Sequence, residues 1–440
     1  MPFLRKLGVR EEESAAVGWS WLFFFTVLSA YYVIRPIRDD IGVASGVETL
    51  PWLFTGSLVG MLLANPLFAF VAARLRREWS VSLAYGFFAL NLLAFFAVLD
   101  TSAPGRGIWT GRVFFVWTSV FNIFVVTIFR TVMVDVFSDD QGRRLFGLIG
   151  AAGTIGSITG SALTSWLVAP LGAANLLLVS AALLQVAAFS ARRLFRLAAR
   201  AGGRTTDSAA VDRTAGIGGG AWEGARRALT DRRFLNITLH MLFFTVLTTF
   251  LYFEQAALVD QAIADRTVRT RFFANIDLIV NLLALVTQTF ATGWFIRLFG
   301  LTAALLFLPI VSVAGFGLLA LVPTVTVLMV FQVVRRAGNF AVNQPAREVL
   351  FTVVPPRDRY KTKSFIDTFV YRAGDQLGAW AYAPMAAIGF GTTGISLVAI
   401  ALGIASAVNA LWLGRQHDAH RAAAGERPAE PGSQVERTLT

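Results

Sequence analysis

Cysteine is absent from the 440 residues, and histidine occurs only three times. The chain therefore has no disulfide framework, no thiol nucleophile and no cysteine-based metal site. Two of the histidines, His417 and His420, lie in the C-terminal tail, which leaves no metal-binding cluster along the sequence. We expect neither a metal nor any other cofactor.

Charged residues are scarce, at 15% of the chain, whereas 55% of the residues are hydrophobic and the mean hydropathy is +0.61. Windows of about 20 apolar residues, the length that spans a bilayer as a helix, recur along the sequence. The net charge of +12 comes mostly from basic residues between these windows, a pattern typical of membrane orientation rather than of a nucleic-acid-binding surface. We therefore expect an integral membrane protein that binds no nucleic acid.

The chain also lacks the phosphate-binding loop G-x-x-x-x-G-K-[ST], so ATP-driven pumping by this chain is not expected and we predict that it is not an enzyme. The run G-A-A-G-T-I-G-S-I-T-G at 150–160 resembles a nucleotide loop only superficially. It lies inside an apolar window, and its small residues have the spacing of a close helix contact. We interpret this run as a packing surface.

Twelve apolar segments follow one another along the chain. They lie near 16–34, 50–73, 80–99, 111–137, 145–169, 172–195, 234–258, 270–296, 301–321, 324–345, 363–388 and 392–413. A polar, glycine-rich stretch at 198–230 cannot bury a core and is typical of a flexible linker. We predict an N-terminal half at 1–197, the linker at 198–230, a C-terminal half at 231–414 and a disordered cytoplasmic tail at 415–440. The first segment follows Glu11–Glu13 and has no small-residue cleavage site, so we expect no signal peptide.

The two halves carry similar features in the same order. Asn65 precedes Arg74 by nine residues in the second segment, and Gln288 precedes Arg297 by nine in the eighth. The connections after the fourth and tenth segments each combine an acid, an apolar patch and a basic turn. We therefore predict an all-α polytopic membrane protein with twelve transmembrane helices in two six-helix repeats, an architecture that resembles the major facilitator superfamily.

Arginines are unevenly distributed between the two sides of the membrane that this segment order defines. One side collects the arginines at 192–200 and the 226–233 group, together with the basic residues at 357–363. The other side has fewer basic residues, among several acids. By the positive-inside rule we expect both termini in the cytoplasm. We expect the membrane to be a bacterial inner membrane.

The tenth segment, F-Q-V-V-R-R-A-G-N-F-A-V-N-Q-P, carries two arginines near its centre. Arg336, Asn339 and Asn343 are three and four residues apart, so a regular helix would place them on one face. Because arginine stays charged, Arg335 and Arg336 must face a carboxylate, an anion or water. Two interpretations are possible: an anion site in a translocation cavity, or a structural ion pair with an acid on a neighbouring helix.

The eleventh segment carries Asp367, Arg372 and Asp375. Charges inside the bilayer are costly, by roughly 2.5–3.5 kcal/mol each on insertion scales, and usually mark functional positions. Arg372 is a candidate for substrate contact, with Asp375 or Asp367 positioning it or carrying a proton. Alternatively, Arg372 and Asp375 neutralise each other within the helix, and Asp367 fixes the end of the segment beside Lys363.

The first segment ends in Y-Y-V-I-R-P-I-R-D-D, with Arg35 and Arg38 one helical turn apart. If the helix continues to about Ile41, both guanidinium groups point into the bundle; if it stops at Ile34, they are loop charges. The eighth segment aligns Asp277, Asn281 and Gln288 as one polar stripe.

Two further groups of residues have conformational roles in this interpretation. Glu254 lies near the end of the seventh segment and is a candidate ion-pair residue. Asp135, Arg143 and Arg144 flank the connection between the fourth and fifth segments, and we interpret them as a latch at a cytoplasmic gate.

Three motifs resemble the ATP/ADP translocase family, a family of nucleotide exchange transporters grouped with the major facilitators. They are Y-Y-V-I-R-P-I-R-D-D at 31–40, R-R-L-F-G-L-I-G-A-A-G at 143–153 and K-x-K-S-F-I-D-T at 361–368. The resemblance covers most of the twelve segments. It implies nucleotide exchange, with Arg38 at the position of the family's first-span lysine, followed by Asp39. It also implies that Glu254 stands for the seventh-span glutamate and Arg372 for the eleventh-span lysine, whereas Thr118 replaces the fourth-span glutamate.

Taken together, these features predict a secondary active transporter that exchanges an anionic, nucleotide-like or related phosphorylated substrate by alternating access. Arginine-rich sites with few lysines suit bidentate recognition of phosphate or carboxylate. A second hypothesis is a proton-coupled carrier of an organic anion or drug, with Asp277, Asp375 or Glu254 titrating. A third is a membrane scaffold or sensor that transports nothing. Besides the bilayer, the expected partner is a small anionic substrate.

Overall fold

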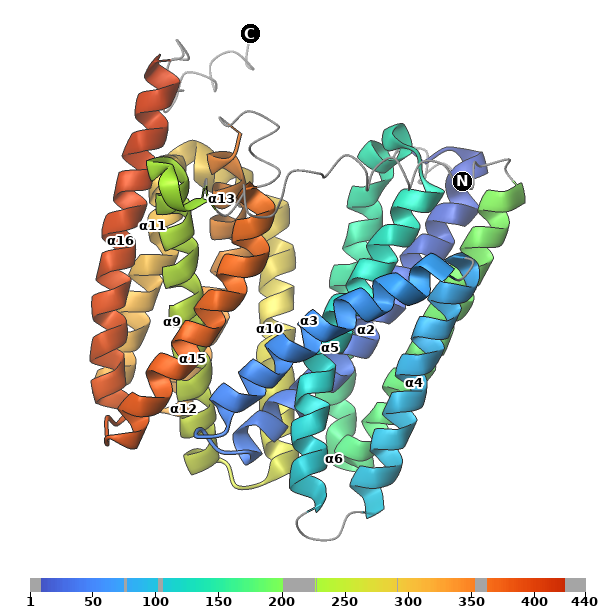
Figure 1. Cartoon of the computed structure of the whole chain (residues 1–440), viewed down its shortest axis with the longest axis horizontal. Helices are drawn as coiled ribbons and strands as arrows, with labels where there is room; N and C mark the ends of the chain where they lie inside the picture. The colour runs from blue at the N-terminus through green and yellow to red at the C-terminus, as the bar shows by residue number, and fades with distance from the viewer. Residues whose placement is uncertain are drawn as a thin grey trace. The chain divides into compact units, whose positions relative to one another are not determined.

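The chain folds as a succession of long helices in the computed structural model, which describes residues 9–74, 77–101, 106–200, 226, 228–290, 292–352 and 362–423. It divides into two compact units (Figure 1). The first unit comprises Met1–Thr214 and Val259–Asn281, and the second comprises Ala215–Leu258 and Leu282–Thr440. Most of the predicted linker and the end of the predicted tail lie outside the described residues.

The regular elements follow the predicted segments. The N-terminal elements are η1 (Glu11–Glu13), α2 (Ser14–Ala44), α3 (Leu50–Arg74), α4 (Arg77–Thr101), α5 (Arg106–Val136) and α6 (Asp139–Arg200). The later elements are α9 (Arg232–Ala262), α10 (Arg266–Phe290), α11 (Thr292–Leu321), α12 (Val325–Gly338), η2 (Asn339–Asn343), α13 (Gln344–Leu350), η3 (Ile366–Val370), α15 (Tyr371–Ala387) and α16 (Thr392–Ala423).

Two of these helices change direction at a glycine. Gly172 in α6 has φ 78° and ψ 159°, so the fifth and sixth predicted segments are the two arms of α6. Gly300 in α11 has φ 77° and ψ 172°, and it separates the end of the eighth segment from the ninth. A positive φ is strained for residues with a Cβ atom, which explains why glycine occupies both bends.

Apolar surface is left open on the helices. Trp166 is 69% exposed and Leu63 is 68% exposed, as expected for side chains that face lipid. In the described part of the chain, nine helices are long and apolar enough to cross a membrane. The all-α, polytopic character of the predicted fold class is confirmed.

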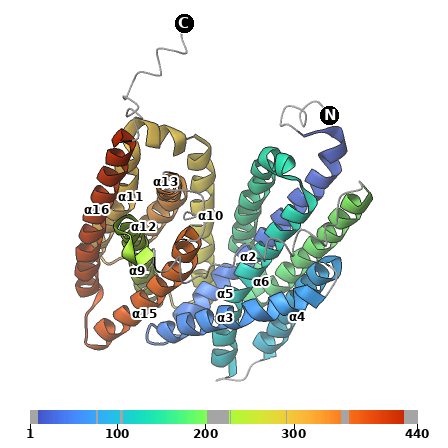
Figure 2. The ribbon, with the colours of Figure 1, turned by 45° about the horizontal axis from the view of Figure 1, so that its top comes forward.

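In the first unit, α2 and α6 lie side by side and pack extensively (Figures 1 and 2). Glycines of the 150–160 run make this approach possible. A Cβ atom at Gly156 would overlap the carbonyl oxygen of Phe25, and one at Gly160 would lie 2.5 Å from that of Ser29. The Ser29 hydroxyl donates to the Gly156 carbonyl across the same contact, at 3.0 Å. The interpretation of this run as a packing surface is confirmed.

In the second unit, glycines bring α15 against α9 in the same way. A Cβ atom at Gly374 would overlap the Thr245 side chain, and one at Gly378 would lie 2.8 Å from Cβ of Thr249. Helices α15 and α9 contain the eleventh and seventh segments. In the first unit, the contact is between the first arm of α6, which is the fifth segment, and α2, which is the first. The glycine-mediated contact therefore joins the first and fifth helices of each six-helix repeat.

Candidate functional site

Helix α2 continues through Pro36 to Ala44, which settles the alternative left open for the first segment. Arg38 therefore lies on a helix rather than in a loop. Its side chain donates to Asp39 at 3.1 Å and to the Ser119 hydroxyl at 3.2 Å. Its guanidinium also lies 4.0 Å from the centre of the Phe115 ring. Both Ser119 and Phe115 belong to α5, so Arg38 joins α2 to α5.

Arg35 forms an ion pair with Asp277 of α10, with 3.4 Å between the charged atoms. Asp277 is 1% exposed, so this carboxylate depends on a cation for its compensation. Asn281, one turn further along α10, is buried and its Nδ2 has no hydrogen-bond partner in the described part of the chain. Arg35, Asp277 and Asn281 all lie in the first unit. The side chain of Gln288 is not among those that the structure describes.

Asp40 is the centre of a cluster that the sequence analysis did not identify. It is 2% exposed, and its two oxygens accept from Arg269 at 2.8 Å and from Arg266 at 3.1 Å. Arg269 reaches Asp260 as well, at 3.2 Å. The doublet Asp39-Asp40, which turns its two carboxylates in different directions on one helix, is the signal that could have indicated this cluster.

The start of α10 is fixed by Asp265. Its carboxylate accepts from the backbone N–H of Val268 at 2.9 Å, as an N-terminal capping residue does. The backbone hydrogen bonds from Val268 and Thr267 lower the pKa of Asp265. Because Arg266 and Arg269 lie in the first turn of α10, this cap determines where both guanidinium groups meet Asp40.

In the second unit, Arg335 points into the helix bundle. It is 3% exposed and donates to the Thr248 hydroxyl at 2.7 Å, to the Phe244 carbonyl at 3.1 Å and to the Ser312 hydroxyl at 3.4 Å. All three acceptors are neutral, and no carboxylate lies within ion-pair distance of Arg335 among the described residues. The cavity beside it, of about 10 Å³, is roughly the size of a single water.

Two five-residue π-helical turns interrupt the tenth and eleventh segments, and sequence reasoning missed both. Pro345 lies two residues after the end of η2. Proline has no N–H to donate, and in a regular helix its ring would clash with the carbonyl of residue 341. A π turn relieves that conflict and rotates the helix before it by one residue. Such turns are frequent at functional sites.

The η2 turn arranges the predicted asparagines differently from a regular helix. Asn343 donates to the Asn339 side chain at 3.1 Å, and its amide oxygen lies 3.3 Å from Nε2 of the buried His240. Arg336 is half-buried, whereas Asn343 is buried. Asn343 therefore belongs to the interior of the second unit, together with Arg335.

The eleventh segment places its charges around η3. Arg372 donates to Asp375 at 3.3 Å, one turn apart on α15. Asp367 lies within η3 and is 4.0 Å from Arg347 of α13. Lys363 pairs with Glu348, also on α13. These contacts tie the end of the eleventh segment to the end of the tenth.

Glu254 of α9 is fully buried and accepts from the Tyr382 hydroxyl of α15 at 3.0 Å. Its other oxygen, Oε2, is buried with no hydrogen-bond partner, and no Lys or Arg of the described ranges lies within ion-pair distance. The neighbouring Gln255 accepts from Gln332 of α12 at 2.8 Å. Glu254 therefore differs from Asp277 and Asp375, each of which has an arginine partner.

The predicted gate residues lie at one end of the first unit. Arg144 forms an ion pair with the buried Glu13 at 2.8 Å, and Gln141 donates to the same carboxylate at 3.1 Å. Asp135 is half-buried near the end of α5, and Arg143 is exposed near the start of α6. The contact ties the start of α2 to the start of α6. The role of Asp135, Arg143 and Arg144 as a gate stays a prediction.

No protein-family model matches the chain, and no curated protein matches it in sequence. Solved structures do match its fold. A bacterial homologue of the iron transporter ferroportin, in an inward-facing state, has a TM-score of 0.64 at 12% identity, over 92% of this chain and 98% of that one.

Two other solved transporters are similar over nearly their whole length. The nucleoside transporter NupG has a TM-score of 0.58 at 16% identity, over 92% of this chain and 98% of that one. The xylose transporter XylE from E. coli has a TM-score of 0.54 at 10% identity, over 89% and 94%. The chain thus has a major facilitator-like fold, which confirms the predicted fold class, and its apolar helices are those of a multi-pass membrane protein.

Proposed function

We propose that the chain is a secondary active transporter that exchanges an anionic, nucleotide-like or related phosphorylated substrate across a bacterial inner membrane by alternating access. The fold supports the transport part of this proposal, since the similar solved structures are named as transporters. A fold alone does not specify a substrate, so the anion is argued from side chains.

The environment of Arg335 is the observation that supports an anionic substrate. A guanidinium that is 3% exposed and has only neutral acceptors leaves its charge uncompensated inside the second unit. Keeping an unpaired charge buried costs free energy, on the order of several kcal/mol. A negatively charged substrate that enters its field recovers part of that cost.

We propose that direct contacts to the substrate come from four other arginines. Arg336 follows Arg335 and is half-buried, and Arg372 keeps a side chain that is 35% exposed while it pairs with Asp375. In the first unit, Arg38 and Arg35 hold one carboxylate each, Asp39 and Asp277. We propose that these arginines bind the anion in the loaded state, and that the acids compensate them when the site is empty. The motifs at 31–40 and 361–368, which resemble the ATP/ADP translocases, support a phosphorylated substrate.

Exchange follows from the chemistry of arginine. A guanidinium does not lose its proton in proteins, so an empty site keeps its positive charge. Its return across the membrane is then unfavourable unless a second anion fills it. We therefore propose antiport, with transport accelerated by substrate on the opposite side.

The first test is thermal stabilisation of the purified protein by ATP, ADP, phosphate, sugar phosphates and carboxylates, since ligands that bind only the folded state raise its stability. We expect a nucleotide or another phosphorylated anion to raise the melting temperature. Arg336→Gln should lower the affinity for that ligand by about tenfold or more. Arg335→Gln should lose the ligand response without lowering the melting temperature of the ligand-free protein, since it removes an uncompensated buried charge.

The control is Arg193→Gln, which removes an arginine that lies over the Phe189 ring on α6, outside the proposed site. If Arg335→Gln lowers the melting temperature and keeps the full ligand response, Arg335 is a structural residue and the anion proposal loses its main support. The stabilising ligand is then loaded into liposomes that contain the protein. If the protein is an exchanger, uptake of external ligand increases when ligand is also present inside.

A second candidate function is proton-coupled transport, and Glu254 is the observation that favours it. Its contacts are neutral, namely the Tyr382 hydroxyl and the Thr392 side chain, and the Phe250 and Phe253 rings pack around Tyr382. A buried carboxyl group without a cation is costly to charge, so it can take up or release a proton when its surroundings change.

Glu254→Gln separates the two functions. The amide keeps an oxygen for the Tyr382 hydroxyl and removes only the titratable proton. If transport is proton-coupled, the variant loses uptake driven by a pH gradient but keeps exchange between equal pH values. If transport is anion exchange alone, the variant behaves like the wild-type chain in both assays.

A further inference from the structure

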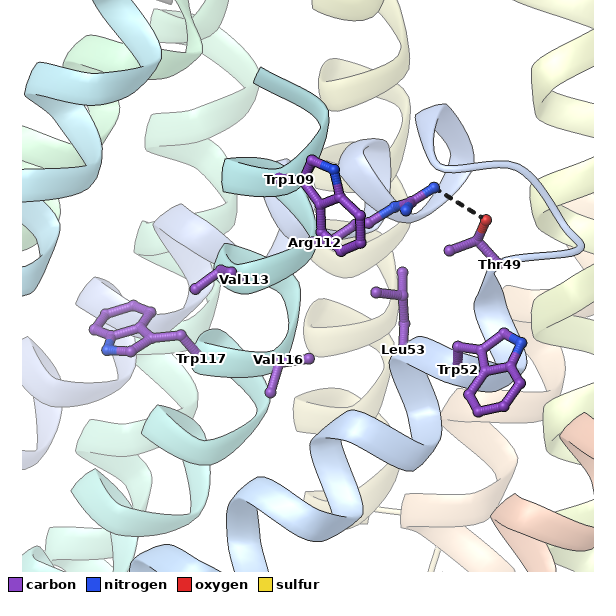
Figure 3. Close-up of a pocket in the computed structure, with 8 residues that line it drawn as sticks. All are labelled: Thr49, Trp52, Leu53, Trp109, Arg112, Val113, Val116 and Trp117. Carbon is purple, nitrogen blue, oxygen red and sulfur yellow. Dashed lines mark hydrogen bonds between the residues drawn. The ribbon is translucent and has the colours of Figure 1, made fainter. Parts of the chain in front are cut away.

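A groove in the first unit opens where α3 and α5 begin (Figure 3). It has a volume of about 690 Å³ and lies outside the residues assigned to substrate. Its lining comes from two short stretches of the chain, Thr49–Leu53 and Trp109–Trp117.

The upper end of this groove is polar and positively charged. Arg112 donates to the Thr49 hydroxyl at 3.4 Å, and its guanidinium lies 4.9 Å from the centre of the Trp109 ring (Figure 3). Its Nε is buried and has no hydrogen-bond partner, and it forms no ion pair within the described residues. This end of the groove therefore carries a guanidinium whose charge has no ion-pair partner within the described residues. The beginnings of α3 and α5 add the positive ends of two helix dipoles.

The walls of the groove are apolar and open. Leu53, Val113 and Val116 line them, and Trp52 and Trp109 are 65% and 67% exposed. The floor is closed because α3 and α5 meet at glycines: a Cβ atom at Gly56 would lie 3.2 Å from Val116. Exposed tryptophans near the ends of apolar helices are typical of the membrane–water interface.

We propose that this groove binds an anionic phospholipid. The phosphate headgroup lies against Arg112 and Thr49, between Trp52 and Trp109, and the acyl chain lies along Leu53, Val113 and Val116. One ligand with a negative head and an apolar tail matches both ends of the groove, whereas a free anion would use only the charged end. The proposal does not depend on the substrate of the transporter.

The test is thermal stabilisation of the full chain in detergent by added phosphatidylglycerol, with phosphatidylcholine as the neutral lipid and inorganic phosphate as the free anion. We expect phosphatidylglycerol to stabilise most, and Arg112→Gln to require about tenfold more of it for the same shift. Arg193→Gln, which removes an arginine with a similar ring contact elsewhere in the unit, should respond like the wild-type chain.

Val113→Phe provides a second variant that leaves Arg112 in place. Val113 is 57% exposed, so the larger ring fills the groove without entering the core, and the response to phosphatidylglycerol should fall. Equal stabilisation by phosphatidylcholine, equal stabilisation by inorganic phosphate, or an unchanged response in both groove variants would each overturn the proposal.

Discussion

Asp40 depends on its two arginines to different degrees. Arg269 is buried with it, with a side chain that is 7% exposed, whereas the side chain of Arg266 is 62% exposed. Removing one member of a buried ion pair strands a charge away from water, while an exposed arginine retains its hydration. The contribution of the cluster to stability therefore comes mainly from the Asp40–Arg269 contact.

Substitution at the two ends of this cluster tests that difference. Asp40→Asn should lower the stability of the protein by about 3 kcal/mol or more, because it leaves Arg269 buried with only the exposed Asp260 as its partner. Arg266→Gln should cost about 1 kcal/mol or less. Thermal unfolding of the purified variants measures both. Equal losses would mean that burial does not set the strength of the cluster.

Individual charges inside apolar segments could be predicted, whereas the pairing of charges at the ends of the segments could not. Arg335 and Arg372 stand out because the residues around them are hydrophobic. Asp40 and Arg269 lie just outside the apolar windows at 16–34 and 270–296, and hydropathy alone left open whether the first helix continues past Ile34. Their pairing depends on two helices far apart in the sequence, which no local pattern encodes.

At the scale of the helix, the close approach of α2 and α6 depends on backbone rather than side chains. Gly156 leaves no room for a Cβ atom, since the carbonyl of Phe25 occupies that space. A backbone atom cannot rotate away as a side chain can, so any larger residue must separate the two helices. The same helix offers a matched control in Gly147, whose Cβ position is open.

Alanine at these two positions should have opposite effects. Gly156→Ala is expected to destabilise the protein by about 1–3 kcal/mol through overpacking. Gly147→Ala should stabilise it by about 0.5–1 kcal/mol, because alanine favours the helix. The readout is the melting temperature of each variant. A gain at Gly156 would show that the two helices can move apart without loss.

Helix positions were predictable from hydropathy because each span must bury its backbone polar groups in lipid and therefore forms a continuous apolar helix. The π-helical turns η2 and η3 were not, since hydropathy does not distinguish a π-helical turn from a regular helix. The one-face grouping of Arg336, Asn339 and Asn343 assumed a regular helix, and η2 interrupts that helix between Arg336 and Asn343.

For the whole molecule, the similarity of the two halves extends from sequence to packing. Gly156 and Gly160 join the first and fifth helices of the first repeat, and Gly374 and Gly378 join the corresponding helices of the second. In each case small residues replace side-chain contacts with backbone contacts, which suits helices that must pack without a hydrophobic driving force in lipid. An inheritance of packing from one repeated unit is a simple account of this correspondence.

The orientation of the molecule in the membrane is a prediction that charge alone makes. Arg192, Arg193 and Arg196 lie at the end of the sixth segment, and Arg232 and Arg233 precede the seventh, so the connection between the halves is strongly basic. Basic connections stay in the cytoplasm, and six segments on either side of this one place both termini there as well. An alkaline phosphatase fusion after residue 104 should therefore be active, whereas fusions after residues 214 and 440 should be inactive. Green fluorescent protein fused after residue 440 should fluoresce. Active phosphatase at residue 440 together with an inactive fusion at residue 104 would show that the orientation in the membrane is the opposite of the one predicted.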